Sequence, residues 1–403
     1  MHARRTVAAL AALTTIGLVG SAQAAWGAPG SGGNSGPGSG TRVVQSNIVS
    51  DIPGMATLTD PLLVNPWGMS FLPTSPLWTS NQGTGTASLF SGAPPAVPPA
   101  IVPLVVTIHG GPPTGQVSNT TTGFPVTGSL GTGTARFIFA TLGGAISAWT
   151  PAAEATDSVV VANPPGASYT GLTMINTPSG PELLAANFAQ RRIDVFDSSF
   201  KLLDTPGLFR GINIPKGFAP FNVQNEGGLL YVTYAKQDAD AHDDVAGPGK
   251  GFVDVFDTGG KLVGRLQHGG FMNSPWGVTQ APADGGQFSG DILVGMFGSG
   301  KIAAFDPVRG KFDGLLRNQD GSPVKIDGLW ALTFGNGAAN ADPKTLYFTA
   351  GPNDESNGLF GSLTLHQRMV NDDDGRPGHD DDDHGKHDHD DDDDRVDDDA
   401  VWN

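Results

Sequence analysis

Short apolar runs alternate with turn-forming residues through most of the chain. Between residues 42 and 367, runs of Val, Ile, Phe and Tyr recur between Gly, Pro, Asn and Asp, and no amphipathic helical period persists beyond one turn. Because strands are bounded by such residues, the pattern predicts an all-β fold.

One short motif recurs six times at a nearly constant spacing. Its first copy is Asn65-Pro66-Trp67-Gly68 and its fifth is Ser274-Pro275-Trp276-Gly277. The equivalent positions are Gly68, Gly115, Gly171, Asn222, Gly277 and Ala331, which are separated by 47, 56, 51, 55 and 54 residues. A repeat of this length is typical of one four-stranded propeller blade, so the sequence predicts six blades.

Strand patterns follow each copy of the motif and predict how the ring closes. A second and a third strand are visible in every repeat, and a fourth strand in five of them, including residues 201–203 in the third repeat and 311–316 in the fifth. The sixth repeat has no fourth strand, while residues 43–49 form an unassigned strand at the other end. We therefore expect a six-bladed β-propeller that is closed by an N-terminal strand completing the last blade, because closure removes unpaired sheet edges.

The segments outside the repeats have a different composition. Residues 1–24 combine a basic start, an apolar run of about 15 residues and the Ala22-Gln23-Ala24 pattern of a secretory signal peptide, which is too short to remain as a membrane anchor. Residues 25–41 are a Gly- and Ser-rich flexible leader, residues 42–370 are the propeller, and residues 371–403 are a disordered tail rich in Asp and His. We expect an exported bacterial protein, either secreted or held in the periplasm or at the cell surface, and a monomer.

Charge and cysteine content exclude several classes of function. The tail holds 16 Asp against three basic residues and so accounts for −13 of the net charge of −17. This charge and the lack of a basic stretch argue against nucleic-acid binding. The absence of Cys excludes disulfides, thiolate metal sites and a Cys nucleophile.

The candidate ligand site lies on one side of the ring, which we call the channel face. It carries the loops leading into the innermost strands and the hairpins between second and third strands. The loops hold Asn65, Trp67, Phe221, Asn222, Asn273, Trp276, Asp327 and Trp330, and the hairpins hold Asn81, Asn187 and Lys236. Indole and carboxamide groups suit neutral polar ligands such as glycans or peptide backbones. In the alternative interpretation, the Trp side chains pack between blades and the Asn residues form turns.

Two segments are weak candidates for metal binding. The fourth hairpin contains Asp238, Asp240 and Asp244, but it lacks the Gly and Glu spacing of an EF-hand. The tail contains His379, His384, His387 and His389 among its Asp residues. Ca²⁺ is the candidate cofactor, and no cofactor is required by any motif; a tail that serves only solubility is the alternative.

These motifs also resemble those of known families. The segments 65–68, 219–222, 231–238, 274–277, 328–332 and 358–361 are similar to those of an uncharacterised family of exported bacterial β-propeller proteins, which are related in shape to NHL-repeat propellers. A more distant resemblance to six-bladed calcium-dependent lactonases implies a channel metal. Asn65, Asn222, Asn273 and Asp327 would supply part of its ligands, but residues 65–72 lack the glutamate that this resemblance implies.

Three hypotheses follow for function. The first is a non-catalytic propeller that binds a glycan, a small molecule or a surface protein on the channel face. The second is a metal-dependent hydrolase of the lactonase type with its site in the channel. The third is metal sequestration through the tail. We favour the first because no catalytic constellation is visible, with no G-x-S-x-G or H-E-x-x-H motif.

Overall fold

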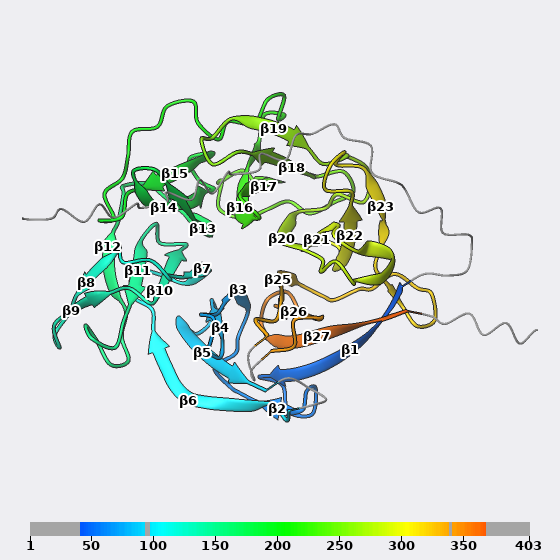
Figure 1. Cartoon of the computed structure of the whole chain (residues 1–403), viewed down its shortest axis with the longest axis horizontal. Coiled ribbons are helices and arrows are strands. Elements are labelled where there is room, and N and C mark those ends of the chain that lie inside the picture. The colour runs from blue at the N-terminus through cyan, green and yellow to red at the C-terminus, as the bar shows by residue number, and fades with distance from the viewer. Residues whose placement is uncertain (1–40, 93–96, 338–340, 368–403) are drawn as a thin grey trace, which may run out of the picture. The chain divides into compact units, whose positions relative to one another are not determined.

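The computed structural model describes residues 41–92, 97–337 and 341–367, and these form a ring of β-sheets (Figure 1). The expected signal peptide, leader and tail, with the four tail histidines, lie outside the described residues apart from Thr41. Among the described residues, no helix is long and apolar enough to cross a lipid bilayer.

Six sheets radiate from a common axis, as the repeat predicts. Their innermost strands are β3 (Pro66–Ser70), β7 (Pro113–Ser118), β13 (Tyr169–Thr177), β16 (Phe218–Glu226), β20 (Pro275–Gln280) and β25 (Leu329–Phe334). The second strands are β4 (Leu77–Asn81), β10 (Phe137–Thr141), β14 (Gly180–Asn187), β17 (Leu229–Lys236), β21 (Ile292–Met296) and β26 (Thr345–Ala350). The third strands are β5 (Thr86–Ser91), β11 (Ile146–Trp149), β15 (Arg192–Phe196), β18 (Gly251–Phe256), β22 (Lys301–Phe305) and β27 (Leu359–Gln367).

Fourth strands complete five blades. They are β6 (Ala100–Thr107), β12 (Val159–Ala162), β19 (Leu262–Arg265), β23 (Phe312–Leu315) and, in the last blade, β1 (Thr41–Ser50). Smaller elements are β2 (Leu58–Thr59), β8 (Pro125–Thr127), β9 (Thr132–Thr134), β24 (Arg317–Asn318) and the 3-10 turn η1 (Gly286–Phe288).

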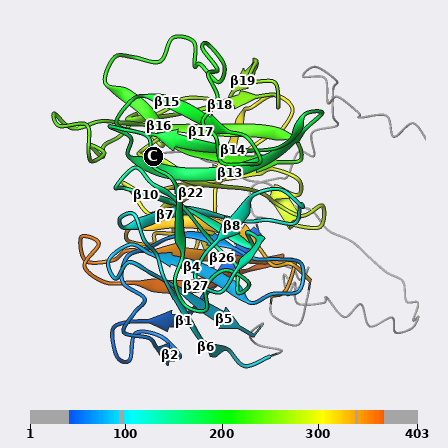
Figure 2. The same ribbon diagram turned by 90° about the vertical axis from the view of Figure 1, so that its left-hand side faces the viewer.

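The N-terminal strand closes the ring, which confirms the prediction. β1 pairs antiparallel with β27 from Thr41 opposite Gln367 to Ser50 opposite Leu359, with one register shift. Both views place β1 and β2 at the periphery of the ring, outside β27 in Figure 1 (Figures 1 and 2). Residues from the two ends of the described chain therefore share one sheet.

The third blade differs from the prediction. Its sheet contains only β13, β14 and β15, and residues 201–203 contribute a single bridge between Phe196 and Leu202 instead of a fourth strand. Pro206 lies three residues after Leu203, and because proline lacks an N–H group it cannot donate to a ladder of hydrogen bonds. The chain therefore leaves this blade early.

Apolar residues fill the spaces between neighbouring blades. In β14, Leu183 and Ala185 pack toward the second blade, whereas Leu184 and Ala186 pack toward the fourth. Successive side chains of a strand point to opposite faces of its sheet, and here both faces are covered. This double burial explains why the strands read as continuous apolar runs.

Candidate functional site

The repeated motif brings the six innermost strands together at the axis. A Cβ atom at Gly68 would lie 2.5 Å from the carbonyl oxygen of Thr114, and one at Gly277 would lie 2.4 Å from that of Trp330. Glycine at this position therefore allows each innermost strand to approach the backbone of the next blade. Asn222 replaces glycine in the fourth blade, and its Nδ2 atom donates to the Trp276 carbonyl at 2.9 Å.

The predicted aromatic residues meet at the axis, but they pack against one another. Trp67 stacks on Trp330 with centroids 3.7 Å apart, and it contacts Phe221 and Trp276 edge-on at 6.3 and 6.2 Å. These four rings, together with Phe188 and Phe297, form what we call the aromatic plug. The four predicted rings are at most 6% exposed. They are therefore core residues, as the alternative interpretation holds.

A small cavity lies on the axis. About 30 Å³ remains between the innermost strands, lined by residues of all six blades, among them Gly68, Gln116 and Asn222. A volume of this size accommodates water molecules but no organic ligand. The channel is therefore filled along its axis.

The polar atoms of the plug have defined partners, with one exception. The Trp276 Nε1 atom donates to the Thr170 carbonyl and that of Trp330 to Asn65 Oδ1, each at 2.9 Å. The Nε1 atom of Trp67 is buried without a hydrogen-bond partner.

The predicted carboxamides of the hairpins are structural. Asn81 is fully buried and its amide donates to Thr86 and Ser88 within the same hairpin. Asn187 is also fully buried and donates to Asp194 Oδ2 at 2.7 Å. In the loops, Asn273 is 8% exposed and its Oδ1 atom accepts from the Gly247 amide. These groups hydrogen-bond within the protein.

Carboxylates gather at the mouth of the channel beside two strained residues. Asn65 and Ser274, at equivalent repeat positions, have φ angles of 46° and 48° although each precedes a proline. Asn65 Nδ2 donates to Glu355 Oε2 at 2.6 Å, and the Ser274 hydroxyl donates to Asp244. These hydrogen bonds hold the two acidic side chains over the plug.

Burial raises the pKa of both carboxyl groups. That of Asp244 rises to about 6, with a further contribution from the charge of Asp243 and an opposing one from the Ser274 hydroxyl. The pKa of Glu355 also rises through burial, opposed by its bond from Asn65 and then increased by the charges of Asp244 and Asp243. The hairpins of the fourth and sixth blades thus place negative charges near each other.

The remaining predicted residues do not converge. Asp327 accepts from the Asn353 amide at 3.0 Å, Asp238 accepts from the His242 amide at 2.9 Å, and Asp240 and Lys236 are exposed. Within the described ranges, no three His, Asp or Glu side chains are grouped so that they could hold a metal ion.

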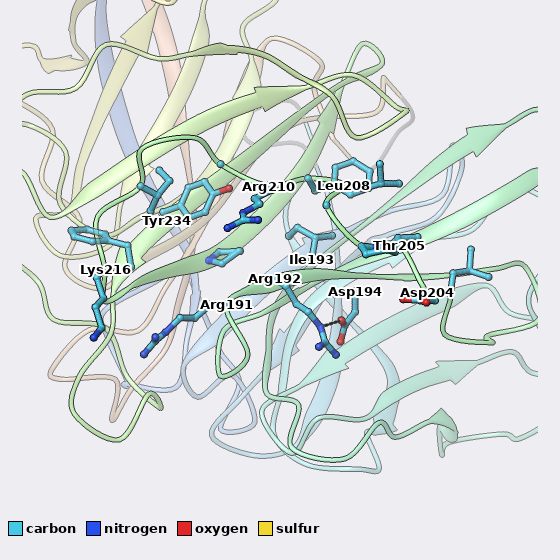
Figure 3. Close-up of a pocket in the computed structure, with 18 of the residues that line it drawn as sticks. Arg191, Arg192, Ile193, Asp194, Asp204, Thr205, Leu208, Arg210, Lys216 and Tyr234 are labelled. Atoms are coloured by element: carbon cyan, nitrogen blue, oxygen red, sulfur yellow. Dashed lines mark hydrogen bonds and ion pairs between the residues drawn. The ribbon is translucent and has the colours of Figure 1, made fainter.

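A large cavity lies off the axis, between the third and fourth blades, where sequence reasoning placed no site. This groove has a volume of about 790 Å³. It is bordered by the outer edge of β15 and by the segment 202–218, and it opens on the channel face because β15 and β16 both begin there. Figure 3 shows the side chains that line it. The missing fourth strand of the third blade leaves this space at the edge of β15, and no sequence pattern distinguishes residues 201–203 from the fourth strands of other blades.

Charged side chains border the groove. Arg191, Arg192, Arg210 and Lys216 line it together with Asp194 and Asp204. Asp194 is 3% exposed and accepts hydrogen bonds from Tyr169, Asn187 and Arg192, so its charge is committed within the third blade.

Two relatives match most of the chain. The uncharacterized proteins R648 and L690 of Acanthamoeba polyphaga mimivirus are 31% and 30% identical to it over 324 and 332 residues, and both matches cover 79% of this chain. They cover 80% and 85% of the two viral proteins. This chain belongs to their family.

Other comparisons add no activity. No protein family model matches the chain. A solved streptogramin B lyase structure is 12% identical with a TM-score of 0.43, covering 81% of this chain and 98% of that one. The hydrazine synthase of Kuenenia stuttgartiensis is 16% identical with the same TM-score, covering 79% and 99%. The six-bladed fold therefore rests on the strand pairing described above.

Proposed function

We propose that this protein is an exported, non-catalytic β-propeller that binds a ligand or partner on its channel face, in the groove between the third and fourth blades. The supporting observation is the contrast between two spaces in the ring: about 30 Å³ along the axis and about 790 Å³ in the groove. Pockets that bind small molecules are typically about 300 to 1,000 Å³ in volume. The ligand site is therefore displaced from the axis.

The contacts of the channel residues favour binding over hydrolysis. Asn65, Asn222 and Asn273 each hydrogen-bond to a protein partner, and the aromatic plug covers the axis between them. A metal-dependent hydrolase would need such side chains to converge on an open coordination site.

Export is supported by the signal-peptide pattern of residues 1–24 and by the resemblance to exported bacterial propellers. Mass spectrometry of protein recovered outside the cytoplasm tests it. A mature chain beginning at Ala25 is expected, and an intact Met1 start in the cytoplasm would contradict export.

The binding site is tested by filling the groove. Leu208 lines it and is 44% exposed, so Leu208→Trp adds bulk there without burying a polar group. Leu130, which is 63% exposed and outside the groove, provides the matched control Leu130→Trp. A mixed panel of sugars, peptides, anions and cations is screened by calorimetry.

We expect Leu208→Trp to bind each ligand found with the native protein at least tenfold more weakly, since steric occlusion removes the contact surface. Leu130→Trp should bind it with unchanged affinity. Equal affinity in both variants would contradict the groove as the site. Turnover of a bound ligand would contradict the non-catalytic assignment.

A further inference from the structure

The groove carries uncompensated positive charge in an acidic protein. Arg192 is paired with Asp194, and the Nε atom of Arg191 donates to Gln237. Arg210 and Lys216 are exposed and make no hydrogen bond or ion pair with any described residue. Because Asp204 is the one other carboxylate in the described lining, cations exceed anions there. In a chain with a net charge of −17, this local excess favours anionic ligands.

A buried hydroxyl group of the groove lining has no acceptor for its proton. Tyr234 is 4% exposed and lines the groove; the Gly211 backbone N–H lies toward its hydroxyl oxygen, but no described residue accepts the hydroxyl proton. Figure 3 shows Arg210 next to Tyr234, with Arg191 and Lys216 toward the same end of the groove. Leaving a buried hydroxyl group unsatisfied costs free energy, which a ligand that accepts its hydrogen bond would recover.

Exposed apolar side chains also line the groove. Leu202 and Leu208 are 37% and 44% exposed there, beside Asp204 and Thr205 (Figure 3). Apolar side chains around a few polar groups are typical of sites for organic molecules rather than for bare ions. The lining thus combines cationic groups with exposed apolar side chains.

We propose that the groove binds a small amphiphilic anion, whose carboxylate or phosphate group lies between Arg210, Lys216 and the Tyr234 hydroxyl group, and whose apolar part packs on Leu202 and Leu208. Guanidinium groups bind both kinds of headgroup through paired N–H donors. This inference rests on the proposed function, because it names the ligand class of the same groove.

Five probes separate the contributions of charge and apolar contact. Octyl phosphate and octanoate each have an anionic headgroup and an apolar chain. Inorganic phosphate has only the anionic group, octanol has the apolar chain without a charge, and octyltrimethylammonium has the chain with a positive charge. Calorimetry on the full mature protein is expected to give one site for octyl phosphate or octanoate, with at least tenfold weaker binding of the other three and weakening by added salt.

The outcomes distinguish this inference from the proposed function. If octanol bound as tightly as octanoate, the assignment of an anionic ligand would be overturned; loss of that octanol binding in Leu208→Trp would still keep the groove as a binding site. If inorganic phosphate bound as tightly as octyl phosphate, the predicted contact with Leu202 and Leu208 would be overturned. No binding of either amphiphile would overturn the inference, and a ligand of another class that is lost in Leu208→Trp would keep the proposed function.

Variants locate the headgroup. Arg210→Gln and Lys216→Gln should each weaken octyl phosphate by about tenfold, because a hydrogen bond to a charged group is lost. Lys325→Gln is the matched control, since Lys325 is exposed and outside the groove. Tyr234→Phe removes only the hydroxyl group, so it should weaken binding severalfold while the melting temperature stays the same or rises. Unchanged affinity in all three groove variants would contradict the placement.

Discussion

Trp67 of the first blade stacks on Trp330 of the last, with their ring centroids 3.7 Å apart and their planes inclined by 21°. The same Trp67 ring contacts Phe221 of the fourth blade and Trp276 of the fifth, so it spans the axis. A side chain in this position connects blades that share no sheet. The aromatic plug is therefore a structural element that holds the centre of the ring.

Truncating Trp67 should destabilise the whole ring. Trp67→Ala leaves a cavity among rings that cannot collapse onto one another, and a substitution of this kind costs about 3 to 5 kcal/mol. Urea unfolding at neutral pH measures this loss in the free energy of unfolding. Leu130→Ala, at a side chain that is 63% exposed, should change the free energy of unfolding by less than about 0.5 kcal/mol. A Trp67→Ala variant as stable as this control would show that the plug is not structural.

Closure by β1 gives a second prediction. Val49 is fully buried and lies opposite Phe360 of β27, whereas Gln45 is exposed on the same strand. Val49→Asp places an unpaired carboxylate in the core and should lower the melting temperature by at least about 10 °C, because burying an unpaired charge costs several kcal/mol. Gln45→Asp should leave it nearly unchanged. Equal melting curves for the two variants would contradict closure through this pairing.

The sequence predicts the blades better than the site, for a physical reason. The spacing from Gly68 to Ala331 reflects the repeat of the innermost strand, where glycine permits a close backbone approach in four of the six blades, so it is visible without a structure. Whether Trp276 faces solvent or another ring depends on contacts across the axis, which no local pattern encodes. The groove was missed because residues 201–203 look like the fourth strands of other blades, and a proline does not tell them apart, since β6 itself contains Pro103.

The glycines at the axis provide a third prediction. A Cβ atom at Gly277 would lie 2.4 Å from the Trp330 carbonyl oxygen, whereas one at Gly270 would have no atom within 4 Å. Gly277→Ala forces two innermost strands apart and should cost more than about 2 kcal/mol, as overpacking of a closed core does. Gly270→Ala should be neutral or slightly stabilising, because it only restricts the unfolded chain. Denaturant unfolding compares the pair, and equal stabilities would refute the close approach of the strands.

A buried carboxyl group makes stability depend on pH. Burial raises the pKa of Asp291 to about 7, and the charges of Asp313 and Asp306 add to this effect. Since the folded protein holds this proton more tightly than the unfolded chain, its contribution is fully present below pH 4 and is lost as the pH rises through about 7. A shift of roughly three pKa units at 1.36 kcal/mol each would give about 4 kcal/mol, and solvent screening of this partly shielded carboxyl group makes the loss smaller than that.

Asp291→Asn removes this ionisation and should therefore stabilise the protein at pH 8 by less than about 4 kcal/mol, with little effect at pH 4. Urea unfolding across that range gives the difference between variant and native protein at each pH. Asp240→Asn, in the exposed part of the fourth hairpin, should give a difference near zero throughout. If the Asp291→Asn difference were instead constant with pH, the carboxyl group would not be ionising within this range in the folded state, and its burial would have no consequence for stability near neutral pH.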